Sequence, residues 1–205
     1  MKKSEQVGWL VGKRIAELEH LTDQSSQKAL LAELRRGVGR QPGEIPQLWG
    51  VLFRNVPEDM MSRTGEPTAA EWAIYTALTL YALHQQGRDP EQKSMNCPGQ
   101  GIGCAVAMLV KNEDEDLNRV RNRFNRFALS VDMPQAVTHL RGIISMLKAN
   151  GIGLDYAKLA EELYNAQFYE SAKRVRLKWG QDFYRYLNRN HNDDNDKDEE
   201  DTENE

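Results

Sequence analysis

Residues 68–87, TAAEWAIYTALTLYALHQQG, restrict the possible folds of this chain more than any other stretch. Between Glu71 and His84 the sequence has no charged residue, and apolar side chains occur on every side of a helix drawn through it. A surface helix keeps one polar face, whereas a helix that is apolar all round is buried by its neighbours. The run is too short to cross a bilayer, which requires about 20 apolar residues. We therefore predict a buried central helix.

Both ends of this predicted helix carry boundary signals. Thr68 stands three residues before Glu71, which is the spacing of a capping box. Pro67 comes immediately before it, and Gly87 follows the last turn, where a glycine can end a helix. The signals place the helix between residues 68 and 87, with other helices packed around it.

Apolar residues at helical spacing predict further helices on both sides of the central one. Ser25 or Ser26 is expected to cap one of them, and Val131 is expected to face inward at the end of another. No segment shows the alternation of a strand. The predicted class is all-α, with about eight or nine helices in two small bundles. The further helices are predicted at residues 4–21, 25–37, 45–56, 104–109, 113–131, 134–147, 156–163 and 168–187.

Composition predicts where the chain divides. Residues 88–101 are polar and contain Asp-Pro, Cys-Pro-Gly and Gly-Gln-Gly, so we expect a boundary there. The predicted parts are an N-terminal helical subdomain (1–90), a C-terminal helical bundle (101–190) and a disordered acidic tail (191–205). The tail holds nine acidic residues and one lysine, whereas residues 1–190 hold 26 basic and 22 acidic residues. This asymmetry favours an anionic partner for the body.

The sequence contains no convincing catalytic, metal or cofactor motif. Glu17 and His20 have the spacing found in carboxylate-bridged metal sites, but such sites need two such pairs. The glycines between residues 99 and 103 follow no strand, so they do not form a nucleotide loop. Cys97 and Cys104 have no second cysteine pair to complete a metal site, which favours reduced thiols. The opening MKKSEQ is followed by no apolar region, so we expect no signal peptide and a cytoplasmic protein that is not an enzyme.

Arginine clusters are the strongest indication of function. Three arginines of the 113–131 helix lie within about 60° of one another on a helical wheel, and few acidic residues accompany them. Arginine forks suit phosphate groups, and such a row follows a phosphate backbone without reading bases. Solvated helix faces with nearby ion-pair partners are the alternative for any one cluster. The candidate nucleic-acid-binding residues are Arg35, Arg36, Arg40, Arg119, Arg123, Arg126, Arg141, Arg174 and Lys178.

Several segments, taken in order, resemble the CasB small-subunit family of the type I-E CRISPR Cascade complex. Each is degenerate alone, and their ordered combination covers roughly residues 29–186. The segments are AELRRGVGRQPGEIPQLWGVLF (32–53), WAIYTALTLYAL (72–83), GIGCAVAML (101–109), RNRFNRFALS (121–130), HLRGIISMLKANGIGLDYAKLAEEL (139–163) and KWGQDFY (178–184). The acidic tail and residues 88–100 fall outside the family pattern, and Gly142 stands where the family often has a second basic residue.

The resemblance implies an all-helical, non-catalytic protein present in two copies within the complex. It implies other Cascade subunits, guide RNA and displaced single-stranded DNA as partners, no membrane and no cofactor. By position it assigns phosphate contacts to Arg35, Arg36, Arg123 and Arg141, with Arg126 extending the same row. The competing hypothesis is a helical adaptor that binds only protein, its arginines meeting acidic partners. Salt-sensitive binding of single-stranded DNA would distinguish the two.

Overall fold

The computed structural model describes residues 1–202, except for the side chains of residue 113 and of residues 190–202. Within that range the chain has nine α-helices and two short 3-10 helices, and no strand beyond an isolated bridge between Asn96 and Leu154. The predicted all-α class is confirmed. The predicted acidic tail spans residues 191–205. Its side chains, and its backbone from residue 203, lie outside the residues that the structure describes.

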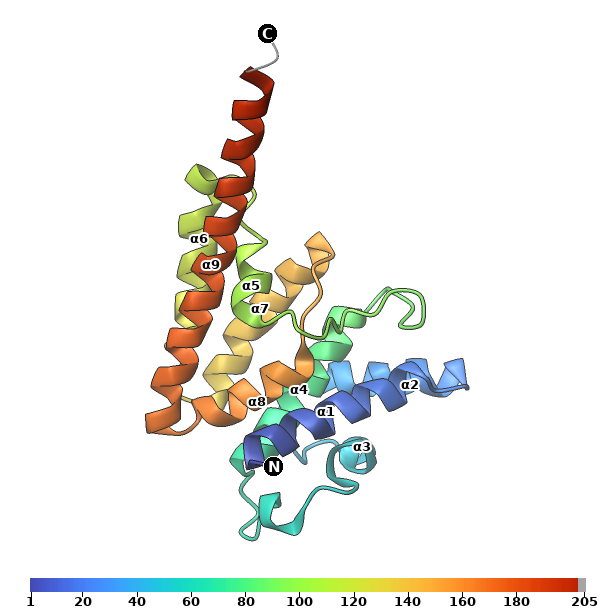
Figure 1. Cartoon of the computed structure of the whole chain (residues 1–205). Helices are drawn as coiled ribbons and strands as arrows, with labels where there is room; N and C mark the ends of the chain where they lie inside the picture. Colours follow the sequence, from blue (N-terminus) through green and yellow to red (C-terminus); the bar gives the residue numbers. More distant parts are fainter. Residues whose placement is uncertain (203–205) are drawn as a thin grey trace.

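In Figure 1, where colour follows the chain, α6 lies beside α9, and α1, α2 and α3 lie on the opposite side of the molecule. Their bounds are α1 (Lys3–Glu19), α2 (Gln24–Arg36), α3 (Trp49–Phe53), α4 (Ala69–Gln85), α5 (Ile102–Ala107), α6 (Glu113–Ala128), α7 (Met133–Asn150), α8 (Tyr156–Ala166) and α9 (Tyr169–Thr202). The 3-10 helices are η1 (Pro46–Leu48) and η2 (Glu58–Met60).

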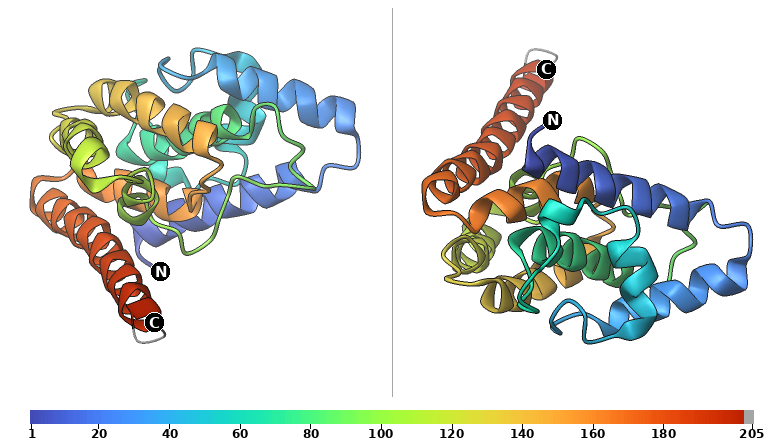
Figure 2. Two further views of the ribbon diagram at one scale, coloured as in Figure 1. Left: turned by 90° about the horizontal axis from the view of Figure 1, so that it is seen from above. Right: turned by 90° about the horizontal axis from the view of Figure 1, so that it is seen from below.

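Helix α4 is the buried central helix that the sequence predicts. The capping box is present, because Glu71 N donates to Thr68 Oγ1 at 3.1 Å and Thr68 N donates to Glu71 Oε2 at 2.7 Å. Leu78, Leu80 and Tyr81 are completely buried. The helix packs against α1, α2, α7 and α8, and it lies among these elements in both views of Figure 2.

A single hydrophobic core connects the two halves of the chain. Buried side chains from Val7 on α1 to Leu187 on α9 belong to one cluster, to which α4 contributes most heavily. The pairs α1–α8, α5–α9 and α6–α7 pack closely around it. The division into residues 1–90 and 101–190 stays a prediction. Among the described residues, no helix has both the length and the apolar character needed to cross a bilayer.

Two local predictions are wrong, for identifiable reasons. Helix α2 is capped by Asp23 instead of a serine, since its two carboxylate oxygens accept from Ser25 N and Ser26 N. An aspartate in this position satisfies two of the free N–H groups at once. Val131 is 85 % exposed instead of buried, because α6 ends at Ala128 and Val131 lies in the turn before Asp132, the cap of α7.

Glycine 103 permits the close packing of α5 on α9, which gives a stability prediction. A Cβ atom there would lie 2.5 Å from the Trp179 carbonyl oxygen and 2.9 Å from Asp182 Cβ. We expect Gly103→Ala to cost about 1–3 kcal/mol of unfolding free energy, because the helices must move apart. Gly180→Ala is the matched control, since a Cβ there meets nothing within 4 Å and alanine favours a helix. Thermal denaturation should give a lower Tm for Gly103→Ala than for Gly180→Ala, and the reverse order would contradict this packing.

Candidate nucleic-acid interface

Helices α6 and α7 form a hairpin that carries a strong excess of positive charge from Leu117 onward. From Leu117 to Asn150 the sequence has one acidic residue, Asp132, whose carboxylate is engaged in capping α7 by accepting from Gln135 N at 2.8 Å. The two helices pack side by side and are joined by a short turn. Beyond the acidic first turn of α6, the hairpin therefore presents almost no carboxylate of its own. Its basic residues are Arg119, Arg121, Arg123, Arg126, Arg141 and Lys148.

Arg123 and Arg126 lie where α6 meets the outer side of α7. Both are exposed, and together with Thr138, His139 and Gly142 they line a shallow hollow of about 100 Å³. A Cβ atom on Gly142 would lie 3.9 Å from Arg123 Nη1, so the guanidinium extends over the glycine. Neither arginine forms an ion pair within the described part of the chain. Their charges are available to an external anion.

The outer side of α7 supplies small side chains between two groups of cations. Thr138 and Ser145 are exposed, Gly142 is half-buried, and the 3.6-residue period places all three on the solvent side of the helix. Arg123 and Arg126 of α6 lie along one flank of this strip of small residues. Arg141 is exposed on the opposite flank and also forms no ion pair with a described residue. A polyanion could therefore lie close to α7 between cations on both sides.

Three of the predicted arginines are already paired with neighbouring carboxylates. Arg119 Nη2 lies 2.6 Å from Asp116 Oδ1, and Arg36 Nη1 lies 2.6 Å from Glu33 Oε1. Arg40 Nη1 lies 3.9 Å from Glu44 Oε2. These are exposed pairs within one helix or loop, of the kind that contributes at most about 1 kcal/mol, so they could exchange for a phosphate. Their contribution to binding is nevertheless expected to be smaller than that of Arg123 and Arg126.

The two candidates on α9 lie apart from this hairpin face, beside α8. Lys178 Nζ is 2.6 Å from Asp182 Oδ2 and 3.4 Å from Glu162 Oε1. Glu162 is buried, which raises the pKa of its carboxyl, and it also accepts from Trp179 Nε1 at 2.7 Å. Lys178 thus neutralises two carboxylates where α8 meets α9. Arg174 is exposed in the same groove and forms no ion pair with a described residue.

The structure also places beside the predicted Arg35 two cations that the sequence analysis did not select. Arg35, half-buried on α2, lies near Lys148 at the end of α7 and Arg88 in the loop after α4. These residues are far apart in the sequence and belong to no common motif. The absence of acidic residues from the whole of α7 is the one signal that could have pointed to Lys148.

The described residues contain no cluster of metal-ligating side chains. No group of three His, Cys, Asp or Glu side chains is placed to hold a metal ion. Glu17 instead pairs with Arg54, its Oε2 lying 2.8 Å from Arg54 Nη2. Cys97 and Cys104 form no disulfide with a described residue, and their reduced state stays a prediction.

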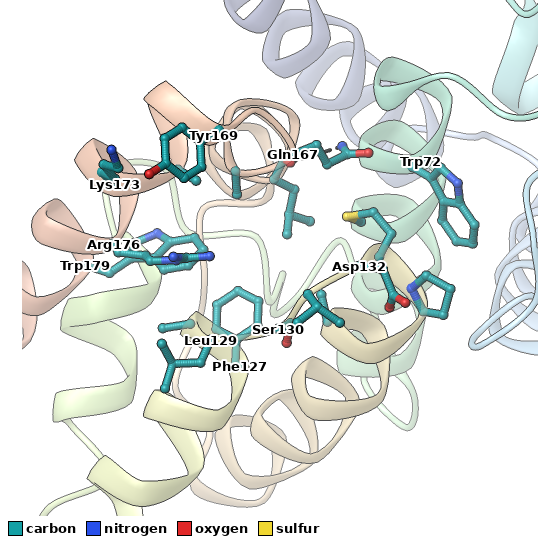
Figure 3. A pocket seen from close by; sticks show the side chains of 18 of the residues that line it. Trp72, Phe127, Leu129, Ser130, Asp132, Gln167, Tyr169, Lys173, Arg176 and Trp179 are labelled. Carbon is teal, nitrogen blue, oxygen red and sulfur yellow. Dashed lines mark hydrogen bonds between the residues drawn. The ribbon is translucent and has the colours of Figure 1, made fainter.

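A pocket of about 800 Å³ lies at the turn of the α6–α7 hairpin, between that turn and the start of α9. In Figure 3, Lys173 and Arg176 of α9 lie across the pocket from Leu129 and Ser130. Its rim includes exposed apolar side chains, with Leu129 68 % and Tyr169 75 % exposed. None of the nine predicted binding residues lines this pocket.

Comparisons with known proteins agree with the fold and with the segments quoted above. Residues 30–184 match the family model described as CRISPR-associated protein Cse2. Crystallised CasB from Thermobifida fusca shares 33 % identity, covers 86 % of this chain and 97 % of its own, and gives a TM-score of 0.71. No curated protein sequence matches.

Two more distant structures share the fold. CasB from M. ruber is 21 % identical, with a TM-score of 0.68 over 89 % of this chain and 97 % of its own. CasB from Thermus thermophilus is 19 % identical, with a TM-score of 0.61 over 90 % of this chain and 99 % of its own. The family match covers most of the chain, and the T. fusca structure is similar over nearly its whole length. This chain therefore belongs to the Cse2 (CasB) family of CRISPR-associated proteins.

Proposed function

We propose that this chain is a non-catalytic small subunit of a type I-E CRISPR Cascade complex in the cytoplasm, where it holds the displaced non-target DNA strand by its phosphates and stabilises the R-loop. The observation that carries the proposal is the outer face of α7. It has no carboxylate of its own and is bordered by Arg123, Arg126 and Arg141, none of which forms an ion pair with a described residue. Its partners would be the other Cascade subunits, a second copy of the chain, guide RNA and the displaced strand.

The chemistry of the face suits a backbone without sequence preference. Guanidinium groups bind phosphate oxygens with two parallel N–H donors, and phosphate contacts position a protein without carrying base information. In a guide-directed complex, base pairing by the RNA supplies the sequence specificity. Because the strand exchange is nearly balanced in free energy, a few phosphate contacts suffice to shift it.

A protein–protein role without nucleic acid is the second candidate, and one observation favours it. Leu129, Val131 and Tyr169 are 68 %, 85 % and 75 % exposed around the pocket of about 800 Å³, and such a group of exposed large apolar side chains is unusual. This surface fits a contact with another subunit. It lies at the turn of the hairpin, away from Arg141, so both surfaces could be occupied at once.

Binding of single-stranded DNA by the isolated protein separates these two candidates. We expect weak, sequence-independent binding, with log affinity falling by about 0.7 per neutralised phosphate for each unit of log salt concentration. Fluorescence anisotropy of two unrelated oligonucleotides across a salt series measures both properties. Absence of binding would favour the adaptor, and binding that ignores salt or strongly prefers one sequence would contradict the proposed phosphate contacts. No cleavage of either oligonucleotide is expected with any divalent metal ion.

A further inference from the structure

A second group of cations surrounds a polar pocket between α2 and the loop that follows α4. The pocket has a volume of about 320 Å³, and Lys28, Arg35 and Arg88 line it together with four glutamines and Asp89. Lys148 reaches the rim from α7, where its Nζ donates to Gln86 Oε1 at 3.0 Å. Four cations from two helices and one loop therefore converge on one hollow.

The loop that carries Arg88 is held in place by a buried glutamine. Gln85 Nε2 donates to the carbonyls of Arg88 and Lys93 at 3.2 and 2.9 Å, and Met95 N donates to Gln85 Oε1 at 2.8 Å. The Arg88 guanidinium donates to the Lys148 carbonyl at 2.9 Å through Nη2. Arg88 thus closes the end of α7, while part of its five-donor fork remains for another acceptor.

Carboxylates do not neutralise this group. None of the four cations forms an ion pair with a described residue. Asp89 lines the pocket, but its Oδ1 accepts from the backbone N–H of Glu91. The pKa of Lys148 is lowered by burial and by the nearby charges of Arg35 and Arg88. A bound anion would relieve this repulsion.

The pocket lies at the end of the flank of α7 that carries Arg141. Arg141 and Lys148 lie about two helical turns apart on the same flank, roughly 10 Å along the axis. A strand held at Arg123, Arg126 and Arg141 could therefore place a further phosphate at Lys148. Eight of the eleven lining residues have polar or charged side chains, and none is a large exposed apolar residue, so the pocket suits a hydrated phosphate group better than an apolar peptide side chain.

We propose that Lys28, Arg35, Arg88 and Lys148 bind one phosphate group of the same nucleic-acid backbone that crosses α7. The inference rests on the proposed function for the identity of the polymer. It adds a site that extends the phosphate path from the α6–α7 hairpin onto α2 and the loop after α4. Three of its four cations, Lys28, Arg88 and Lys148, are absent from the set that the sequence predicts.

The test measures DNA affinity across a salt series for Lys148→Gln and for the double variant Lys28→Gln with Lys148→Gln. Both variants keep Arg88, so its hydrogen bond to the backbone carbonyl of residue 148 at the end of α7 is retained. Circular dichroism checks that the variants are folded. Arg63→Gln is the matched control, because Arg63 is exposed in the loop before α4, about 25 Å away at the opposite end of that helix. We expect the double variant to bind roughly fivefold to tenfold more weakly and its salt slope to fall by about 0.7, with Arg63→Gln near wild type.

The outcomes separate the site from the function it extends. A wild-type protein that binds DNA in a salt-dependent way, with the double variant equal to Arg63→Gln, would overturn the site and leave the proposed function standing. Absence of salt-dependent binding in the wild type would remove both. Pyrophosphate and polyglutamate serve as competing probes. If the variants lost affinity for either probe but kept their salt slope for DNA, the site would belong to a free phosphate or an acidic peptide, and the backbone assignment would be wrong.

Discussion

Replacing Arg123 and Arg126 by glutamate is expected to weaken binding of single-stranded DNA by roughly a hundredfold at low salt, and replacing both by alanine by roughly tenfold. The alanine variant loses two phosphate contacts, whereas the glutamate variant also repels the backbone. Both side chains are exposed, so the fold should be retained. Fluorescence anisotropy gives the affinities, and thermal denaturation confirms that the variants remain folded.

The matched control lies on the same helix. Arg119 is paired with Asp116, and Arg121 is half-buried and donates to Asn118 Oδ1 at 2.7 Å. Changing both to alanine removes the same total charge from α6 as the Arg123/Arg126 alanine variant, but away from the hollow beside Gly142. We expect a loss of affinity of only about twofold to threefold. Equal losses for the two pairs would mean that net charge, not the geometry of the α6–α7 face, governs binding.

The largest expected effect on stability comes from the middle of α4. Leu78 is completely buried in the common core, and Leu78→Ala should cost about 2–5 kcal/mol through lost burial and the cavity left behind. For a chain of this size, that loss corresponds to roughly 5–15 °C in Tm. Leu177→Ala is the control, since Leu177 is 62 % exposed on α9. Similar Tm values for the two variants would contradict a central position for α4.

The elements predicted most accurately are those whose signals are local. Thr68 and Glu71 mark the start of α4 through bonds between residues three apart, and the uncharged run after them leaves no face for solvent. The apolar spacing of α7 likewise identifies Leu140, Ile144 and Leu147, which are all buried. Helix type and burial follow from neighbours along the chain in these cases, so the sequence alone is sufficient.

The errors arise where two local signals compete or where a helix ends. Asp23, Ser25 and Ser26 are all good capping residues, and only the backbone geometry selects the aspartate. Val131 continues the apolar spacing of α6, but the helix stops earlier so that Asp132 can begin the next one. Periodicity indicates a face without fixing the residue at which the helix terminates.

The candidate site likewise contains residues that the sequence identifies and residues that only folding brings together. Arg123 and Arg126 can be selected from one helix, because their separation and the lack of nearby acidic residues are visible in sequence. The second salt bridge of Lys178 is different: Asp182 is four residues away, whereas Glu162 comes from α8 and is brought there only by folding. The meeting of Arg35, Arg88 and Lys148 depends on three separate parts of the chain, and no local pattern predicts it.

The most direct test of the central claim is permanganate footprinting of the displaced strand in an assembled type I-E Cascade complex bound to its DNA target. Complexes carrying this chain with Arg123→Ala and Arg126→Ala are compared with wild type after size exclusion has confirmed that the subunit is incorporated. The account predicts normal assembly and a displaced strand that re-anneals, so that permanganate-reactive thymines become protected. Normal assembly with an unchanged footprint would contradict the assignment of these arginines to the displaced strand.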